Sequence, residues 1–234
     1  MKKTTEYLNI LTIVFIVCLV ISNVITGKII DTGITLFGQP LTIAGAIICY
    51  PICYLITDVV GEIWGKQEAS KIVKYGFIGQ VLATLIIILT TYTPYIDADM
   101  QSAYTKLLGQ NWVFVVGSLS AYLVSQYLDV HIFHKLKEKT NGKHKWIRNN
   151  ASTMLSQLVD TAIFITIAFG LGFGWLFNNP IALINMLIGQ YAIKLLCAVV
   201  DTPFFYLLTR EHKERSKYDN DYNQNLIEIR NKYN

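Results

Sequence analysis

Six long apolar runs, separated by short polar stretches, dominate the pattern of hydrophobic positions along the chain. They cover about residues 8–27, 42–60, 72–92, 112–134, 151–174 and 180–208. A bilayer core of about 30 Å is crossed by roughly 20 residues of α-helix. The pattern therefore predicts an all-α integral membrane protein with six transmembrane helices in residues 1–209, followed by a polar cytoplasmic tail at 210–234.

Polar stretches between the apolar runs, and a proline within one run, add detail to this prediction. A Gly- and Thr-rich stretch at 27–41 is expected to be a loop, and Pro51 is expected to kink the second helix. The later part of the polar stretch at 94–111 is expected to form a short amphipathic helix in the membrane interface. The charged tail is expected to continue the last helix before it frays.

Composition and charge support a membrane protein and orient it. The chain is 53% hydrophobic and 15% charged, with a mean hydropathy of +0.39, which is too apolar for an ordinary soluble domain. With the N-terminus inside, 17 of the 20 Lys and Arg residues fall on the cytoplasmic side. The positive-inside rule then places both termini in the cytoplasm of a multi-pass protein of the cell membrane. This bias explains the net charge of +4 without a nucleic-acid partner.

Two near-repeats link the later runs. SQYLDVHIF at 125–133 and SQLVDTAIF at 156–164 share five residue types at the same offsets, and IGQ occurs at both 78–80 and 188–190. If runs 1–3 and 4–6 are repeats, an odd number of spans in each unit makes them run in opposite directions. The echoes are consistent with a 3+3 inverted repeat.

Charged residues inside the predicted spans are the main candidates for function. Each costs on the order of 2.5–3.5 kcal/mol at a helix centre, so such groups must meet one another, water or a ligand. At 1.5 Å per residue, Asp160 lies roughly 18 Å beyond the inner basic cluster and Lys194 roughly 21 Å from the outer side, so the two can pair near the midplane. Asp58, Asp129 and Asp201 lie nearer the cytoplasmic end.

The polar residues of the last two spans lie on single helix faces. On the sixth span Gln190, Lys194 and Asp201 share one side, while Asn185 lies across the helix. The fifth span has polar residues at i, i+3 and i+4 around Gln157 and Asp160. The stripes suggest the wall of a water-accessible cavity. The alternatives are a static Asp160–Lys194 ion pair, and hydrogen bonds that only bridge helices at Ser156, Gln80 and Gln126.

The sequence favours neither an enzyme nor a cofactor protein. No His lies deeper than position 131, and no nucleophile, metal or Gly-rich phosphate motif occurs in the spans. His131 and His134 with Asp129 are better explained as a solvated helix end than as a metal site. We therefore expect no catalytic residues, no metal and no cofactor.

Several longer stretches carry a family resemblance. They are ISN at 21–23, YPICYLITDVVGEIWG at 50–65, LVSQYLDVHIFHKLKEKT at 123–140 and WIRNNASTMLSQLVDTAIF at 146–164, together with the buried Lys194. They resemble the queuosine precursor transporter family, and the match covers all six spans in order. The resemblance implies uptake of 7-cyano- and 7-aminomethyl-7-deazaguanine, and in some members queuine or queuosine, for transfer RNA modification.

The resemblance and the buried charges together give a hypothesis for the site. A carboxylate can accept the adjacent N–H donors of a guanine-type ring in bidentate fashion, an amide can meet its carbonyl, and aromatic rings can stack on it. The candidate substrate-binding residues are Asn23, Tyr54, Asp58, Gln126, Asp129, Gln157, Asp160, Phe164 and Lys194. The candidates for gating at the inner mouth are Glu62, Arg148 and Asp201.

Two other classes stay open. One is a substrate-capture subunit of an energy-coupling-factor importer, although the first span has no alanine for the docking motif of such subunits. The other is an intramembrane enzyme or a scaffold, which does not account for a midplane Lys and Asp. The expected partners are a deazapurine substrate and the lipid bilayer. A homodimer is compatible with the sequence, but no residue points to it.

Overall fold

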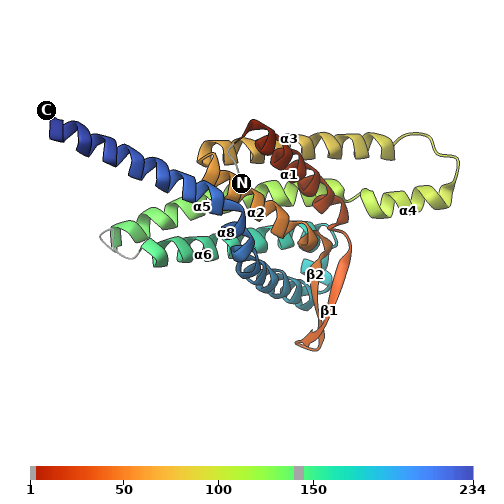
Figure 1. Cartoon of the computed structure of the whole chain (residues 1–234). Coiled ribbons are helices and arrows are strands. Elements are labelled where there is room, and N and C mark those ends of the chain that lie inside the picture. The colour runs from red at the N-terminus through yellow and green to blue at the C-terminus, as the bar shows by residue number, and fades with distance from the viewer. Residues whose placement is uncertain (1–3, 140–144, 234) are drawn as a thin grey trace.

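The protein is a helical bundle with one β-hairpin (Figure 1). The computed structural model describes the backbone of residues 4–139 and 145–233, and the side chains of 4–128, 131, 132, 135 and 154–210. The elements in chain order are α1 (Thr5–Ile25), β1 (Ile29–Leu36), β2 (Gln39–Ala44), a 3₁₀ turn (Gly45–Ile48), α2 (Tyr50–Ile63), α3 (Lys66–Thr91), α4 (Ala98–Leu108), α5 (Asn111–Lys139), α6 (Lys145–Ile165), a π-helical segment (Thr166–Leu171), α7 (Trp175–Asn178) and α8 (Pro180–Tyr233).

Five helical stretches in the described ranges are long and apolar enough to cross a membrane. They are Thr5–Ile25, Lys66–Thr91, Ala98–Leu128, Met154–Leu171 and Pro180–Arg210. The prediction of a mostly helical membrane protein is confirmed. The count of six spans, the inverted repeat and the cytoplasmic placement of both termini stay predictions.

The second apolar run does not form one continuous helix, and this prediction is wrong. Residues 42–44 belong to strand β2, 45–48 form the 3₁₀ turn, and α2 has 14 residues. Pro51 lies in the first turn of α2, where its missing N–H needs no partner, so it starts the helix instead of kinking it. A hydropathy scan does not divide 42–60, because the whole stretch is apolar. In the structure its first residues, 42–44, pair with β1 instead of joining the helix.

The expected loop at 27–41 is the hairpin β1–β2, so the all-α description was incomplete. Leu36 pairs with Gln39 across the two-residue turn Phe37–Gly38, and both turn residues have positive φ, 52° and 74°. That is the geometry of a type I′ turn, whose twist matches the flanking strands. The β-branched residues of IIDTGITL favour a strand, but Gly33 and the short length of the segment made this sequence signal weak.

Two other expected helices form, while the membrane-interface position of the first and the fraying of the second stay predictions. The polar stretch after α3 contains helix α4, which Asp97 caps by accepting hydrogen bonds from the backbone N–H groups of Asp99 and Met100. Helix α8 continues through Pro203 and on to Tyr233, so the tail extends the last helix as predicted.

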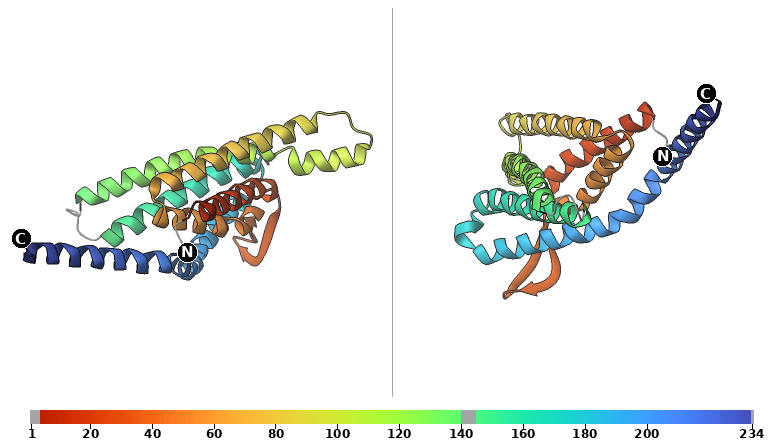
Figure 2. Two further views of the ribbon diagram at one scale, coloured as in Figure 1. Left: turned by 45° about the horizontal axis from the view of Figure 1, so that its top comes forward. Right: turned by 90° about the vertical axis from the view of Figure 1, so that its left-hand side faces the viewer.

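Two apolar clusters hold the bundle together. One joins α1, α2 and α3 around Phe15, Ile56 and Ile72, and the other joins α5, α6, the π-helical segment and α8 around Phe114, Phe169 and Met186. The second cluster also includes Ala44 of β2, a residue of the second apolar run. Figure 2 shows the hairpin projecting from the helices at its turn, and α4 at the end of the bundle away from the C-terminus.

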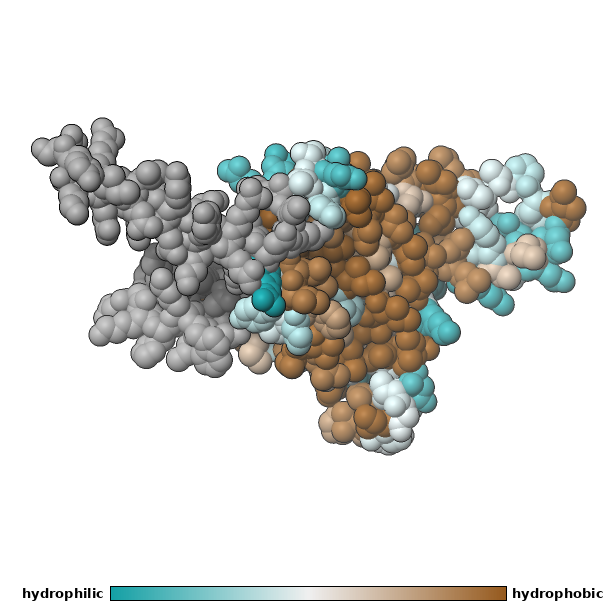
Figure 3. Space-filling view, viewed as in Figure 1, coloured by the Kyte–Doolittle hydropathy of each residue, from teal (hydrophilic) through white to brown (hydrophobic). Residues whose placement is uncertain are grey.

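A broad apolar surface covers the middle of the bundle on the face seen in Figure 3. Large apolar side chains are exposed on several helices, such as Leu82 and Leu89 on α3, Leu123 on α5 and Val199 on α8. A surface this extended and apolar is stable only against lipid or another protein. Hydrophilic residues gather at the α4 end, beyond the apolar zone.

Helix α1 packs very closely on α3 at Gly76, and this contact gives a test of the fold. A Cβ atom at position 76 would lie 2.7 Å from both Leu19 Cδ2 and Phe15 Cε1. We expect Gly76→Ala to destabilise the protein by about 1–3 kcal/mol, because the two side chains must move. Thermal unfolding in detergent measures the effect. The control is Gly117→Ala, whose Cβ atom meets its nearest neighbours at an ordinary 3.5 Å. Equal unfolding temperatures for the two variants would contradict the close contact.

Candidate functional site

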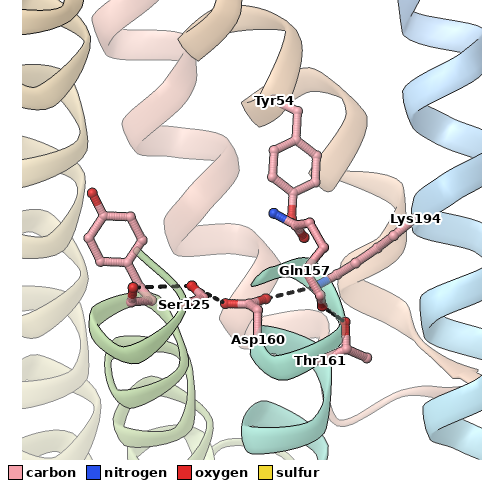
Figure 4. A network of polar contacts seen from close by, with 7 residues as sticks. Tyr54, Ser125, Gln157, Asp160, Thr161 and Lys194 are labelled. Carbon is pink, nitrogen blue, oxygen red and sulfur yellow. Dashed lines mark hydrogen bonds and ion pairs between the residues drawn. The ribbon is translucent and has the colours of Figure 1, made fainter. Parts of the chain in front are cut away.

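The buried charges meet where α6 and α8 pack together. Lys194 Nζ on α8 lies 2.8 Å from Asp160 Oδ2 on α6, so the predicted pair forms. The Lys194 side chain is 5% exposed and the Asp160 side chain 20% exposed. Ser125 on α5 donates a hydrogen bond of 3.3 Å to the other carboxylate oxygen, Oδ1. The carboxylate thus joins three helices (Figure 4).

Two tyrosines of α2 complete the cluster. The Tyr50 ring lies below the Lys194 ammonium, 5.4 Å from Nζ to the ring centroid, at the distance of a cation–π contact. Tyr54 stacks on Tyr50 with 6.0 Å between the centroids and donates a hydrogen bond of 3.3 Å to Gln157 Oε1. We call Tyr50, Tyr54, Ser125, Gln157, Asp160 and Lys194 the central cluster.

Helical spacing explains how α6 contributes two of these groups. Gln157 and Asp160 stand at i and i+3, so both face the same side of α6. Thr161 lies on this side too, but its hydroxyl is used up locally, donating to the Gln157 carbonyl at 2.8 Å. Asp160 and the amide of Gln157 are therefore the groups of α6 that reach across to neighbouring helices (Figure 4).

The central cluster has binding capacity left over. A carboxylate offers about four lone-pair sites, and the described contacts of Asp160 use two of them. Within the described residues Gln157 accepts from Tyr54, while its Nε2 atom donates to none of them. Lys194 has three N–H donors, of which Asp160 takes one. In this state Asp160 and Lys194 hold each other, so a ligand must replace one of these contacts.

Asn23 belongs to a second buried polar cluster and not to the central one. Its Nδ2 atom donates to Gln80 Oε1 at 3.2 Å, joining α1 to α3. Thr84, one turn after Gln80, donates to Asn111 Oδ1 at 3.0 Å and so reaches α5. These contacts support the alternative interpretation of Gln80, in which its side chain bridges helices by hydrogen bonds.

The other predicted site residues are spread over different surroundings. Phe164 is 4% exposed and packs in the apolar cluster with Phe114 and Phe169, where a ligand cannot stack on it. Gln126 is exposed on α5, beside the inward-facing Ser125. The repeated Ser–Gln pair thus presents its serine on α5 and its glutamine on α6 to the central cluster.

The structure describes the side chains of some of the acidic residues predicted at the inner end. Asp58 on α2 is exposed, and Asp201 on α8 is half-buried and near enough to repel it electrostatically. Glu62 is exposed one turn after Asp58 and makes contacts of its own. The side chains of Asp129 and Arg148 lie outside the described residues.

Sequence reasoning did not assign Tyr50 or Ser125 to the site. It placed Gln190 and Asn185 on opposite sides of the sixth span, but their contacts with the hairpin were not foreseen: Ala44 N–H donates to Gln190 Oε1, and Asn185 Nδ2 donates to Leu36 O. No spacing rule shows these contacts, because they depend on where the hairpin lies.

An open groove lies elsewhere on the protein. It is lined by one side of α4 with Phe173, and its polar lining residues include Gln101, Thr105 and Lys106. None of its lining residues belongs to the central cluster. The groove has no carboxylate and one basic side chain, so it offers little to the N–H donors of a heterocycle.

Comparison with known proteins gives consistent matches. Residues 44–208 match the family model described as a putative vitamin uptake transporter. The chain is 31% identical over 177 residues to a Bacillus subtilis protein named "Probable queuosine precursor transporter", covering 74% of this chain and 73% of that protein.

Two shorter matches carry similar names. A "Probable queuosine precursor transporter" of Haemophilus influenzae is 26% identical over 51% of this chain and 49% of its own length. A "Queuosine precursor transporter" of Escherichia coli is 28% identical over 51% of this chain and 52% of its own length. No solved structure matches the chain significantly.

The ion pair makes a prediction about stability. Removing one partner leaves an uncompensated charge in an apolar environment, so Lys194→Met should destabilise the protein by roughly 3–5 kcal/mol. The double variant Asp160→Asn/Lys194→Met should recover most of this loss, since it leaves no charge. Thermal unfolding of the single and double variants in detergent measures both effects.

The control is the exposed pair Glu68–Lys71, with 2.6 Å between Oε1 and Nζ. Because exposed pairs contribute about 0–1 kcal/mol, Lys71→Met should change stability little. A double variant at Asp160 and Lys194 that is no more stable than Lys194→Met would contradict the coupling of the two charges.

Proposed function

Because the chain belongs to the family of putative vitamin uptake transporters, as its motifs predicted, we propose that it imports queuosine precursors and binds them at the central cluster. The family is one of transporters and not of enzymes, and the chain is a multi-pass protein of the cell membrane. The names of its relatives support queuosine precursors as the substrate class. The substrates we propose are 7-cyano- and 7-aminomethyl-7-deazaguanine, with queuine or queuosine as further candidates.

The observation that carries this proposal is the half-buried Asp160 carboxylate, held by a buried lysine and a serine beside two tyrosines. A 7-deazaguanine ring has adjacent N–H donors, from the ring and the exocyclic amine, spaced to meet the two oxygens of one carboxylate. Such charge-assisted hydrogen bonds are roughly twice as strong as neutral ones. Asp160 would exchange its contacts with Ser125 and Lys194 for these two donors.

The neighbouring groups suit the rest of the ring. The Gln157 Nε2 atom and the freed Lys194 ammonium are donors for the ring carbonyl, and Tyr50 and Tyr54 offer faces on which a flat heterocycle stacks. Lys194 also balances the Asp160 charge in the empty state. An unpaired carboxylate would be costly in the bundle, so the lysine keeps the empty site stable until the ligand arrives.

The inner acidic residues form the second part of the proposal. Asp58 on α2 and Asp201 on α8, two helices that pack together, repel each other electrostatically on the predicted cytoplasmic side, and Glu62 lies one turn after Asp58. A cation beside these carboxylates would reduce their repulsion. We assign Asp58 to the inner part of the binding path, where it would neutralise an aminomethyl group. Glu62, Asp201 and Arg148 are assigned to the inner mouth.

Uptake into liposomes tests the proposed function. The purified chain, reconstituted without any other protein, should accumulate radiolabelled 7-aminomethyl-7-deazaguanine when a concentration gradient is imposed. Asp160→Asn should lower uptake roughly tenfold or more, because it replaces a charged acceptor of about 1.5–3 kcal/mol with a weaker one. Asp99→Asn is the matched control, since Asp99 is an exposed carboxylate on α4, outside the central cluster.

The outcomes separate the candidate functions. No uptake by the folded wild-type chain, together with uptake after addition of an ATPase pair, would assign the chain to the energy-coupling-factor class instead. Equal uptake by Asp160→Asn and Asp99→Asn would overturn the assignment of the site while leaving the transport activity standing.

A further inference from the structure

The free edge of strand β2 lies against helix α8. The Ala44 backbone N–H donates to Gln190 Oε1 at 3.0 Å, and Asn185 Nδ2 donates to the backbone carbonyls of Leu36 at 2.7 Å and Gln39 at 3.2 Å. Gly189 lies between them, so close that a Cβ atom there would be 2.6 Å from the Thr42 carbonyl oxygen. We call this contact between β2 and α8 the seam.

The seam contains an unusual number of unsatisfied polar atoms. Four buried side-chain N or O atoms of the described residues have no hydrogen-bond partner, and three of them lie here, on Thr42 (Oγ1), Asn185 (Oδ1) and Gln190 (Nε2). Asn185 and Gln190 are fully buried. Each such atom is destabilising by about 1–3 kcal/mol, so the closed seam is easier to open than a fully satisfied one.

The orientation of the two amides follows from their partners. Gln190 accepts a hydrogen bond from an N–H group, so its oxygen must face Ala44 and its nitrogen must be the atom without a hydrogen-bond partner among the described residues. Asn185 donates to two carbonyls, so its nitrogen must face them and its oxygen is left over. Turning either amide would break these bonds. The fourth unsatisfied atom, on Asn111, lies in the second polar cluster, where its amide contacts only the Thr84 hydroxyl, which can donate or accept.

The groups of the hairpin that occupy the seam resemble one edge of the proposed substrate. The β2 edge presents peptide N–H and C=O groups to α8, and the ring of a 7-deazaguanine has the same two groups adjacent to each other in a lactam. The Gln190 amide has an acceptor oxygen and a donor nitrogen next to each other, which is the pair that a lactam requires. Asn185 and Gln190 are separated by about 7.5 Å along α8, and Gln190 precedes Lys194 by one turn, about 6 Å.

From these contacts we propose that the seam contains a second, outer docking site, where the Gln190 amide binds the lactam edge of a purine-like substrate before it reaches Asp160 and Lys194. The β1–β2 hairpin occupies the site in the present state and competes with the substrate for it. This inference rests on the proposed function, since it takes the same substrate class. It assigns binding to a residue of α8 that the central cluster does not include.

The competition explains the unsatisfied atoms. When the hairpin moves away from α8, the Gln190 oxygen and the Asn185 nitrogen lose their backbone partners and become free for a ligand. A lactam can accept a hydrogen bond from the Gln190 nitrogen while it donates to the Gln190 oxygen, whereas the Ala44 N–H satisfies the oxygen alone. The substrate therefore binds Gln190 better than the hairpin does, and the hairpin closes the empty site.

Two variants with opposite expected effects test the inference. Gln190→Met removes the docking amide, so the KM for uptake of 7-aminomethyl-7-deazaguanine should rise roughly tenfold, about 1.4 kcal/mol. Gly38→Val strains the hairpin turn, because Gly38 has a φ of 74° and open space around it, and it leaves α8 untouched. This variant destabilises the hairpin, which competes with the substrate, so the KM should stay the same or fall.

Hydrogen exchange at the Ala44 amide is the second measurement, and it should accelerate in both variants because both loosen the hairpin. If Gln190 only anchors the hairpin, the two variants should change the KM in the same direction, and this result would overturn the inference. An unchanged KM in Gln190→Met would overturn it too. Matched controls are Gln67→Met and Thr35→Val, both at exposed positions away from α8. A wild-type chain without uptake would instead refute the proposed function.

Discussion

The arrangement of this bundle depends on the ion pair between Asp160 and Lys194. Neither charge is tolerable alone in an apolar bundle, and each becomes tolerable when the other lies 2.8 Å away. The pair therefore requires α6 and α8 to be neighbours at matching depth. Ser125 adds α5 to this contact, and the Tyr50 ring adds α2. One electrostatic constraint thus defines which four helices surround the proposed binding site.

Helix α8 connects this site with the hairpin. Along one helix, Asn185 and Gln190 bind backbone groups of the hairpin, Lys194 binds Asp160, and Asp201 lies near Asp58. A ligand that moved along α8 would meet neutral amides first, then a buried ion pair, and then two carboxylates. The strand edge beside the amides needs a cover, because its N–H and C=O groups are otherwise left unpaired in an apolar environment. The side chains of α8 supply it in part.

The central cluster shows how far a sequence can predict a site. Depth along two helices was enough to predict the pairing of Asp160 and Lys194, because rise per residue is regular and buried charges must pair. Asn23 was assigned to the central site by motif and by the chemistry of its amide, yet it contacts Gln80 instead. Gln126 and Phe164 were chosen by motif and residue type, but one is exposed and the other is packed in the apolar core. Helix rotation decides these outcomes, and it is set by packing.

By itself, the sequence determined that the chain is a helical membrane protein with a costly pair of opposite charges in its interior, and its motifs identified the family. The first two properties follow from composition, periodicity and spacing, which are local, and the family follows from the resemblance of its motifs. The tertiary structure alone decided that residues 29–44 form a hairpin, that Pro51 lies in the first turn of a helix, and that Gln190 binds the edge of β2. The hairpin depends on strand pairing, and the Gln190 contact joins a side chain to a backbone N–H 146 residues away, and such contacts have no periodic signature in a uniformly apolar sequence.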